Sequence, residues 1–186
     1  MLFRSQAPEV YVVDPAHTFP AFEVPHLGVA TQRGRFDRTR GRITLDRAAH
    51  AGTIDIETDA ASVSTGNAKL DAVLRSDEFF DVERHPKIVF RADKLEFRDD
   101  VPVRAEGSLT MLGVTRPVML EVRQFACTRK PFLVRTTCGA DVEARLSRSA
   151  FGMASYASFV GDEVRIVIQV EAVRQEPAAE PQNSGG

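Results

Sequence analysis

Two long runs of alternating residues constrain the fold of this chain more than any other feature. In residues 163–172 every second position is apolar, and residues 138–146 alternate in the same way. Side chains of a β-strand point to its two faces in turn, so such runs predict strands with one apolar and one polar face. The chain therefore needs a sheet that buries one face along its whole length.

Shorter runs with the same period follow one another along most of the chain. The clearest is 52–58, and less regular ones occur at 11–13, 18–26, 34–36, 41–45, 87–97, 103–111 and 118–125. Turn residues separate them, among them Asp99-Asp100 and Gly161-Asp162. Many short strands with turn residues between them indicate an all-β sandwich or barrel.

One region departs from this pattern. Residues 67–76 place Leu70, Val73 and Leu74 at helical spacing behind Asn67, a residue that suits a helix N-cap. A second helical turn is predicted over 77–82, where Phe79 and Phe80 stand side by side among charged residues. We therefore expect a short helical insertion around 67–82 between two strands.

The composition sets the class of protein and excludes several functions. A length of 186 residues fits one domain, and a net charge of −2 does not suit a nucleic-acid surface. No stretch reaches the roughly 18–20 apolar residues of a membrane-spanning helix. Twelve Phe and no Trp give aromatic walls without polar groups. We divide the chain into an arm (1–10), a domain (11–174) and a Pro-, Gly- and acid-rich tail (175–186) that is expected to be disordered.

The first residues raise the question of export. MLFRSQA has no apolar segment of the kind a secretory leader needs, although Ser5 and Ala7 have the spacing of a cleavage site and Pro8 argues against one. The expectation is a leader that is absent or truncated in this chain.

The two cysteines bear on the same question. If the segments around Cys127 and Cys138 are antiparallel strands, the two thiols lie within disulfide range. Such a bridge would indicate an oxidising compartment. The alternative is two unrelated small apolar residues, and two thiols alone do not make a structural zinc site.

Seven motifs in a fixed order make the chain similar to a known family. They are YVVDPAHTFPAFEVPHLG from Tyr11, GRF at Gly34, ITLD at Ile43, SVSTGNAKLDAVLRSDEFFDVERHPKIVF from Ser62, GSLTMLGVTRPVML at Gly107, CGADVEARLSRSAFGM at Cys138 and GDEVRIVIQVEA at Gly161. Over about 11–174 the chain resembles the YceI-like family of polyisoprenoid-binding proteins. The resemblance implies a single lipocalin-like antiparallel β-barrel of about eight strands that holds a polyisoprenoid or similar long amphiphile.

The resemblance also bears on the cellular location of the protein. At one position the residue of this chain differs from the one that the family usually has. The paired cysteines resemble those of the branch exported to the bacterial periplasm, so a periplasmic location is expected, with the cytoplasm as the alternative. Ala150 stands where the family usually has Asp.

The inward parity of the strands gives a candidate lining. It comprises Phe22, Val24, His26, Phe36, Ile43, Leu45, Ile54, Ile56, Ile88, Phe90, Leu109, Met111, Val118, Leu120, Val142, Leu146, Val164, Ile166 and Ile168. An eight-stranded barrel is just wide enough to hold one small ligand, or to be filled by its own side chains, and the pattern fits both. For ligand contact we select Phe22, Val24, His26, Phe36, Ile54, Phe79, Phe80, Phe90, Leu109, Met111 and Phe151.

The motifs of an enzyme or a metalloprotein are missing from the sequence. His17 and His26 lack the spacing of a zinc site, and there is neither a nucleophile elbow nor a phosphate-binding loop. The expected function is therefore non-catalytic binding of an isoprenoid or acyl lipid, without cofactor or metal, for transport, storage or sequestration. A homodimer is a further expectation. The alternatives are a lipid-modifying enzyme that uses the same lumen and a structural or partner-binding barrel with a filled core.

Overall fold

The structure is a computed structural model that describes residues 7–129 and 135–176, and most of these residues lie in strands. The elements are β1 (Glu9–Val13), β2 (Phe19–His26), β3 (Ala30–Phe36), β4 (Thr39–Asp46), β5 (Ala51–Asp59), η1 (Ala60–Ser62), β6 (Val63–Ser64), α1 (Ala68–Arg75), β7 (Lys87–Arg98), β8 (Val101–Met111), β9 (Val114–Thr128), β10 (Thr137–Ser147), η2 (Ser149–Phe151) and β11 (Glu163–Arg174). The predicted tail lies outside the described residues except for Gln175 and Glu176. The first strand begins at Glu9, two residues before the predicted start of the domain.

The sheet closes on itself because β1 pairs with β4 on one side and with β11 on the other. The order β1-β4-β5-β7-β8-β9-β10-β11 then returns to β1, and the paired strands are antiparallel. This confirms the predicted antiparallel barrel of eight strands. The strands β2, β3 and β6 continue the barrel wall after short breaks that separate them from neighbouring strands. The first part of β11 therefore pairs with β2, and the last part of β11 pairs with β1.

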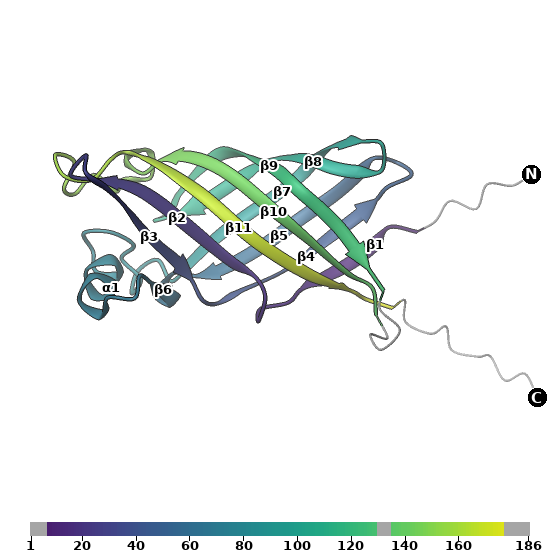
Figure 1. Cartoon of the computed structure of the whole chain (residues 1–186), viewed down its shortest axis with the longest axis horizontal. Helices are drawn as coiled ribbons and strands as arrows, with labels where there is room; N and C mark the ends of the chain where they lie inside the picture. Colours follow the sequence, from purple (N-terminus) through teal and green to yellow (C-terminus); the bar gives the residue numbers. More distant parts are fainter. Residues whose placement is uncertain (1–6, 130–134, 177–186) are drawn as a thin grey trace, which may run out of the picture.

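The barrel has two ends of different construction (Figure 1). The helix α1, the short strand β6 and the β2–β3 hairpin lie together at one end, which we call the mouth. The start of β1 and the end of β11 lie at the opposite end, which we call the base.

The longest alternating runs form the most regular pair of strands. The strands β10 and β11 pair over eleven residues, with Ala140 opposite Val170, Val142 opposite Ile168 and Ala144 opposite Ile166. Their polar neighbours point outward, where Arg165 forms ion pairs with Glu23 and Glu143. Period two along the sequence thus becomes one apolar inner wall and one charged outer wall.

The predicted helical insertion is present but its regular part is short. The Asn67 side chain accepts hydrogen bonds from the backbone N–H groups of Lys69 and Leu70, at 3.1 and 3.3 Å, and α1 begins there. The helix ends at Arg75, and residues 76–85 form a series of turns rather than a second helix. Leu74 on α1 is buried against the barrel.

A packed cluster fills the base. Tyr11, Leu45, Cys138 and Ala172 are buried there, with Phe97 and Phe125 against them. The Tyr11 hydroxyl donates to the Glu9 carboxylate at 2.7 Å, and burial raises the pKa of this phenol. Cys127 and Cys138 are directly opposite each other in the β9–β10 ladder and form a disulfide.

Removing this disulfide should destabilise the barrel. Its two cysteines close a short loop, and the loss of that constraint on the unfolded chain costs about 3 kcal/mol. We expect the double variant Cys127→Ser, Cys138→Ser to lose this free energy of unfolding in urea titrations. Unaltered protein should lose a similar amount on reduction, whereas the variant should not respond to reductant. Equal unfolding midpoints for oxidised and reduced protein would contradict the expectation.

Candidate functional site

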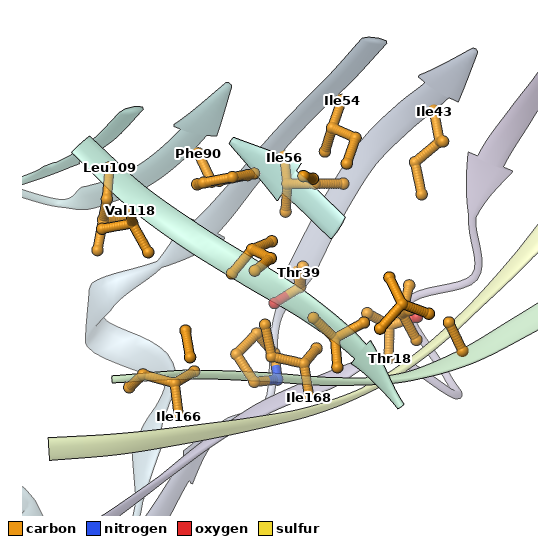
Figure 2. Close-up of a pocket in the computed structure, with 18 of the residues that line it drawn as sticks. Thr18, Thr39, Ile43, Ile54, Ile56, Phe90, Leu109, Val118, Ile166 and Ile168 are labelled. Carbon is orange, nitrogen blue, oxygen red and sulfur yellow. The ribbon is translucent and has the colours of Figure 1, made fainter. Parts of the chain in front are cut away.

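The interior of the barrel contains an elongated cavity of about 220 Å³. Its walls are mainly aliphatic and come from strands all around the barrel. Figure 2 shows Ile43, Ile54 and Ile56 on one wall and Ile166 and Ile168 on the facing wall. Phe90, Leu109 and Val118 line its side nearer the mouth. The interior therefore holds free space and is not fully packed with side chains.

The polar side chains in this wall are Arg104, whose guanidinium group lies 3.6 Å from the Glu96 carboxylate, and three threonines whose hydrogen bonds are already made. The hydroxyl oxygens of Thr39 and Thr58 lie 3.0 Å apart and bond to each other. The Thr18 hydroxyl donates to the Glu171 carbonyl and accepts from the Glu171 N–H, both at 3.1 Å. The hydroxyl oxygens of these three threonines thus already have partners and offer little to a polar guest.

A second cavity, of about 500 Å³, lies at the mouth. One side is formed by α1 and the turn with Phe79 and Phe80, and the other by the end of β2 and the loop between β10 and β11. Met111 and Leu146 line both cavities, so the two spaces adjoin. Met111 and Leu146 therefore mark the place where the inner cavity and the mouth cavity meet.

Aromatic rings line the junction of the two cavities. Phe22 packs on Phe36, and Phe36 meets Phe80 edge to face, with ring centroids 6.0 and 5.3 Å apart. Phe79 stacks on Tyr156 across the mouth at 5.9 Å. Gly34 makes room for this arrangement, because a Cβ there would lie 2.4 Å from the tip of the Phe22 ring.

The structure places ten of the eleven predicted ligand-contact residues in cavity walls. Those in the inner cavity are Phe36, Ile54, Phe90, Leu109 and Met111. Those in the mouth cavity are Phe22, Val24, His26, Phe79, Phe80 and, shared with the inner cavity, Met111. Phe151 lines neither of these two cavities; it lies 2% exposed in the core behind the mouth. That these side chains contact a ligand stays a prediction.

Strand alternation did not find the loop residues of the mouth. Leu27, Tyr156 and Phe159 line the mouth cavity from the β2–β3 turn and the β10–β11 loop. Loops have no fixed period, so no pattern in the sequence marked these side chains as facing the cavity. The threonines of the inner wall were missed for a different reason, because the predicted lining was built almost entirely from apolar residues of the inward-facing parity.

Two arginines near the mouth are engaged with the backbone. Arg148 is 4% exposed and donates to the carbonyls of Met153, Ser155, Val160 and Gly161, at 2.8–3.0 Å. Arg75 donates to the carbonyls of Ala61 and Val63, at 2.9 and 3.0 Å. Both guanidinium groups therefore hold the chain at the mouth, and these donors are not available to a ligand's head group.

The histidines of interest have separate positions. His17 lies in the break between β1 and β2, where its Nδ1 is 2.8 Å from the Asp14 carboxylate, and that hydrogen bond raises the pKa of the imidazole. His26 lines the mouth cavity. Among residues 7–129 and 135–176, no group of three or more His, Cys, Asp or Glu gathers as a metal site would require. In the same residues, no helix has the length and apolar character to span a bilayer.

The fold and its cavities define a closed, lipocalin-like antiparallel β-barrel with an apolar interior. The chain belongs to the YceI-like family, because the family model described as a YceI-like domain matches residues 11–172. A UPF0312 protein of Pectobacterium carotovorum is 30% identical over 86% of this chain and 82% of its own length. Protein YceI of Salmonella arizonae is 29% identical over 86% of this chain and 83% of its own length.

Solved structures share the barrel. The YceI protein of Campylobacter jejuni matches with a TM-score of 0.70 and 25% identity, over 81% of this chain and 90% of its own. BcnA of Burkholderia cenocepacia matches with a TM-score of 0.70 and 22% identity, over 86% of this chain and 98% of its own. A polyisoprenoid-binding domain of Saccharophagus degradans, implicated in plant cell wall breakdown, matches with a TM-score of 0.65 and 16% identity. The match covers 89% of this chain and 98% of that domain's chain.

Arg148 should be a main support of the mouth. In Arg148→Ala, four backbone carbonyls lose a charged donor in a buried position, and we expect a loss of about 3 kcal/mol in the free energy of unfolding. The matched control is Arg145→Ala, which removes an exposed ion pair with Glu163 and should cost less than about 1 kcal/mol. Urea titrations measure both, and equal losses would contradict the supporting role of Arg148.

Proposed function

We propose that this protein binds a long-chain isoprenoid or acyl amphiphile inside the barrel and holds it without changing it chemically. The observation that carries the proposal is the pair of adjoining cavities with apolar walls, in which the hydroxyls of Thr18, Thr39 and Thr58 already have their partners. Such a space suits a hydrocarbon tail and disfavours a polar guest.

The energy of burying a tail is sufficient for binding. Each buried CH₂ contributes about 0.8 kcal/mol, so a five-carbon isoprene unit contributes roughly 4 kcal/mol. Three or four such units exceed the estimated ~4–15 kcal/mol that association costs. The tail alone can therefore hold the ligand, and a specific head-group site is not needed.

Membership of the YceI-like family supports the same ligand class. The domain of Saccharophagus degradans that shares this barrel is described as polyisoprenoid-binding. At 16% identity this likeness shows the fold only. The support comes from the combination of that fold with the apolar cavities of this chain.

The carboxyl groups with displaced pKa values favour binding over catalysis. Hydrogen bonds to neighbouring side chains lower the pKa of Asp14, Glu23, Glu57, Glu143 and Asp162. None of these five carboxyl groups lines either cavity. The Tyr156 phenol does line the mouth cavity, and its hydrogen bond to Glu78 raises its pKa, which keeps the phenol protonated and makes it a weaker acid. A lipid-modifying enzyme would need a displaced acid or base beside its substrate.

The disulfide supports a role in an oxidising compartment. A bridge between Cys127 and Cys138 persists where thiols are not kept reduced, and in bacteria the periplasm is such a place. We propose that the protein carries, stores or sequesters its lipid there.

A bulky side chain placed inside the barrel should block the ligand. Ala144 lines the inner cavity, and Ala144→Phe fills space that a tail would occupy. We expect the affinity for the isoprenoid alcohol geranylgeraniol, followed by native mass spectrometry, to fall roughly tenfold or more. Circular dichroism should show that the variant is folded.

The control is the next residue of the same strand. Arg145 points outward, with 65% of its side chain exposed, and Arg145→Phe should leave the affinity unchanged. If Ala144→Phe binds geranylgeraniol as tightly as the unaltered protein, the ligand does not occupy the barrel.

A further inference from the structure

Large apolar side chains are exposed at the mouth. Leu27, Val29, Val73, Tyr156 and Phe159 are 54%, 82%, 39%, 49% and 56% exposed, and we call this set the apolar collar. Among the described residues, Val101 and Met119 are the other large hydrophobics with comparable exposure. Both lie on the barrel strands β8 and β9, and neither lines a cavity. Exposed apolar surface of this kind is thus concentrated at one end of the molecule.

Hydrogen bonds join the loops and turns that carry the collar. The N–H of Leu27 donates to the carbonyl of Phe159 at 2.7 Å, which joins the β2–β3 turn to the β10–β11 loop. The Tyr156 hydroxyl donates to the Glu78 carboxylate at 3.0 Å, which joins that loop to the turn after α1. Leu27, Val73, Tyr156 and Phe159 also line the mouth cavity. Four of the five collar residues therefore border the candidate ligand site.

The backbone at two of these positions is unusual for the residues that occupy it. Leu27 has φ 55° and Tyr156 has φ 58°, and Gly28 next to Leu27 has φ 67°. Turns with positive φ favour Gly, Asn or Asp, and large apolar side chains are uncommon there. Leu112 in the β8–β9 turn has the same conformation, with φ 54°. Tyr156 is held by Phe79 and Glu78, and both Leu27 and Tyr156 place part of their side chains in the wall of the mouth cavity while about half of each stays exposed.

We propose that the apolar collar inserts into the surface of a lipid bilayer and places the mouth against the membrane, so that a tail passes between bilayer and barrel without crossing water. The inference rests on the proposed function, since it concerns how the lipid reaches its cavity. A second copy of the chain seated on the collar would instead cover the entrance. Tyr156, with an apolar ring and a bonded hydroxyl, has the character of residues that lie at membrane interfaces.

The charges around the collar select the kind of membrane contact. Residues 26–29 and 154–160 contain no Lys or Arg. On the opposite side of the mouth, α1 carries the exposed Lys69 one turn before Val73, and the carboxyl groups of Asp77 and Glu78 follow the helix, so basic residues are not clustered there. Attraction to anionic lipids would require clustered basic residues. The collar should therefore bind neutral phosphatidylcholine surfaces by apolar contact, with little dependence on salt.

Single tryptophans test the insertion directly, because the chain has no Trp of its own. Phe159→Trp places an indole in the collar, and Met119→Trp is the matched control on β9. On addition of phosphatidylcholine vesicles, the emission of Phe159→Trp should shift to the blue and be quenched by brominated lipid. Met119→Trp should not respond. An unchanged Phe159→Trp spectrum would overturn the proposal.

Polar substitutions test whether the contact serves loading. The double variant Leu27→Ser, Phe159→Ser should lose vesicle association, and its uptake of geranylgeraniol from vesicles should slow roughly tenfold or more. Because Leu27 and Phe159 also line the mouth cavity, retained binding is tested at Val29, which is 82% exposed and lines neither cavity. Val29→Ser should also slow uptake from vesicles, and its equilibrium binding of geranylgeraniol delivered from ethanol should be retained. Val101→Ser with Met119→Ser is the matched control and should behave like the unaltered protein in both assays.

The outcomes separate this proposal from the proposed function. If the unaltered protein takes up geranylgeraniol by neither route, the proposed function fails, and the Phe159→Trp shift decides on the collar alone. If uptake from ethanol occurs while vesicles cause no shift, the collar proposal is overturned. If sedimentation velocity then shows a dimer that the Leu27→Ser, Phe159→Ser variant dissociates, the collar is an interface between two copies.

Discussion

The closure of the sheet through β1 is the constraint on which the rest of the structure depends. This short strand bonds to β4 on one side and β11 on the other, so the ladder has no free edge in the closed part of the barrel. Eight strands give an interior only slightly wider than side chains need to fill it. Small residues such as Ala140 and Ala144 on the inner wall leave the space that becomes a cavity. The width of the lumen thus follows from strand number, and its free volume from a few small side chains.

The breaks in β1–β2, β3–β4 and β5–β6 give the barrel a mouth that differs from its base. At the first break Thr18 turns its hydroxyl to the backbone of Glu171, and beside the second Thr39 bonds Thr58 of β5. A break in a strand leaves backbone groups that need partners, and Thr18 supplies one at the first break. Thr39 and Thr58 satisfy each other's hydroxyl groups. At the base the chain has no such need, and Tyr11, Leu45 and Cys138 pack into a closed cluster. The barrel therefore has an apolar interior and, at the end that carries α1, an adjoining mouth cavity.

Much of the fold could be predicted from the sequence, and less of the site. The alternation of apolar and polar residues predicted β10 and β11, and it predicted that Ile54, Leu109 and Ile166 point inward. It could do so because the period of a strand fixes the face on which each side chain lies. It did not decide between a filled and a hollow interior, since that depends on the summed volume of side chains from several strands. Phe151 was selected without a strand period to place it: it lies in the short helix η2, packs in the core and lines neither of the two cavities, and its contact with a ligand stays a prediction. Tyr156 and Phe159 were missed because their positions depend on a loop that Arg148 holds from within.

The use of Arg75 and Arg148 as internal supports has a consequence for selectivity. Their charges are committed to backbone carbonyls, so these donors cannot distinguish a phosphate from an alcohol at the end of a lipid. Discrimination then falls to the apolar walls, where one methylene more or less changes binding by only about 1–3 kcal/mol. If the barrel holds a lipid as proposed, it should sort its ligands by the length and bulk of their tails and tolerate different chemistry at the other end.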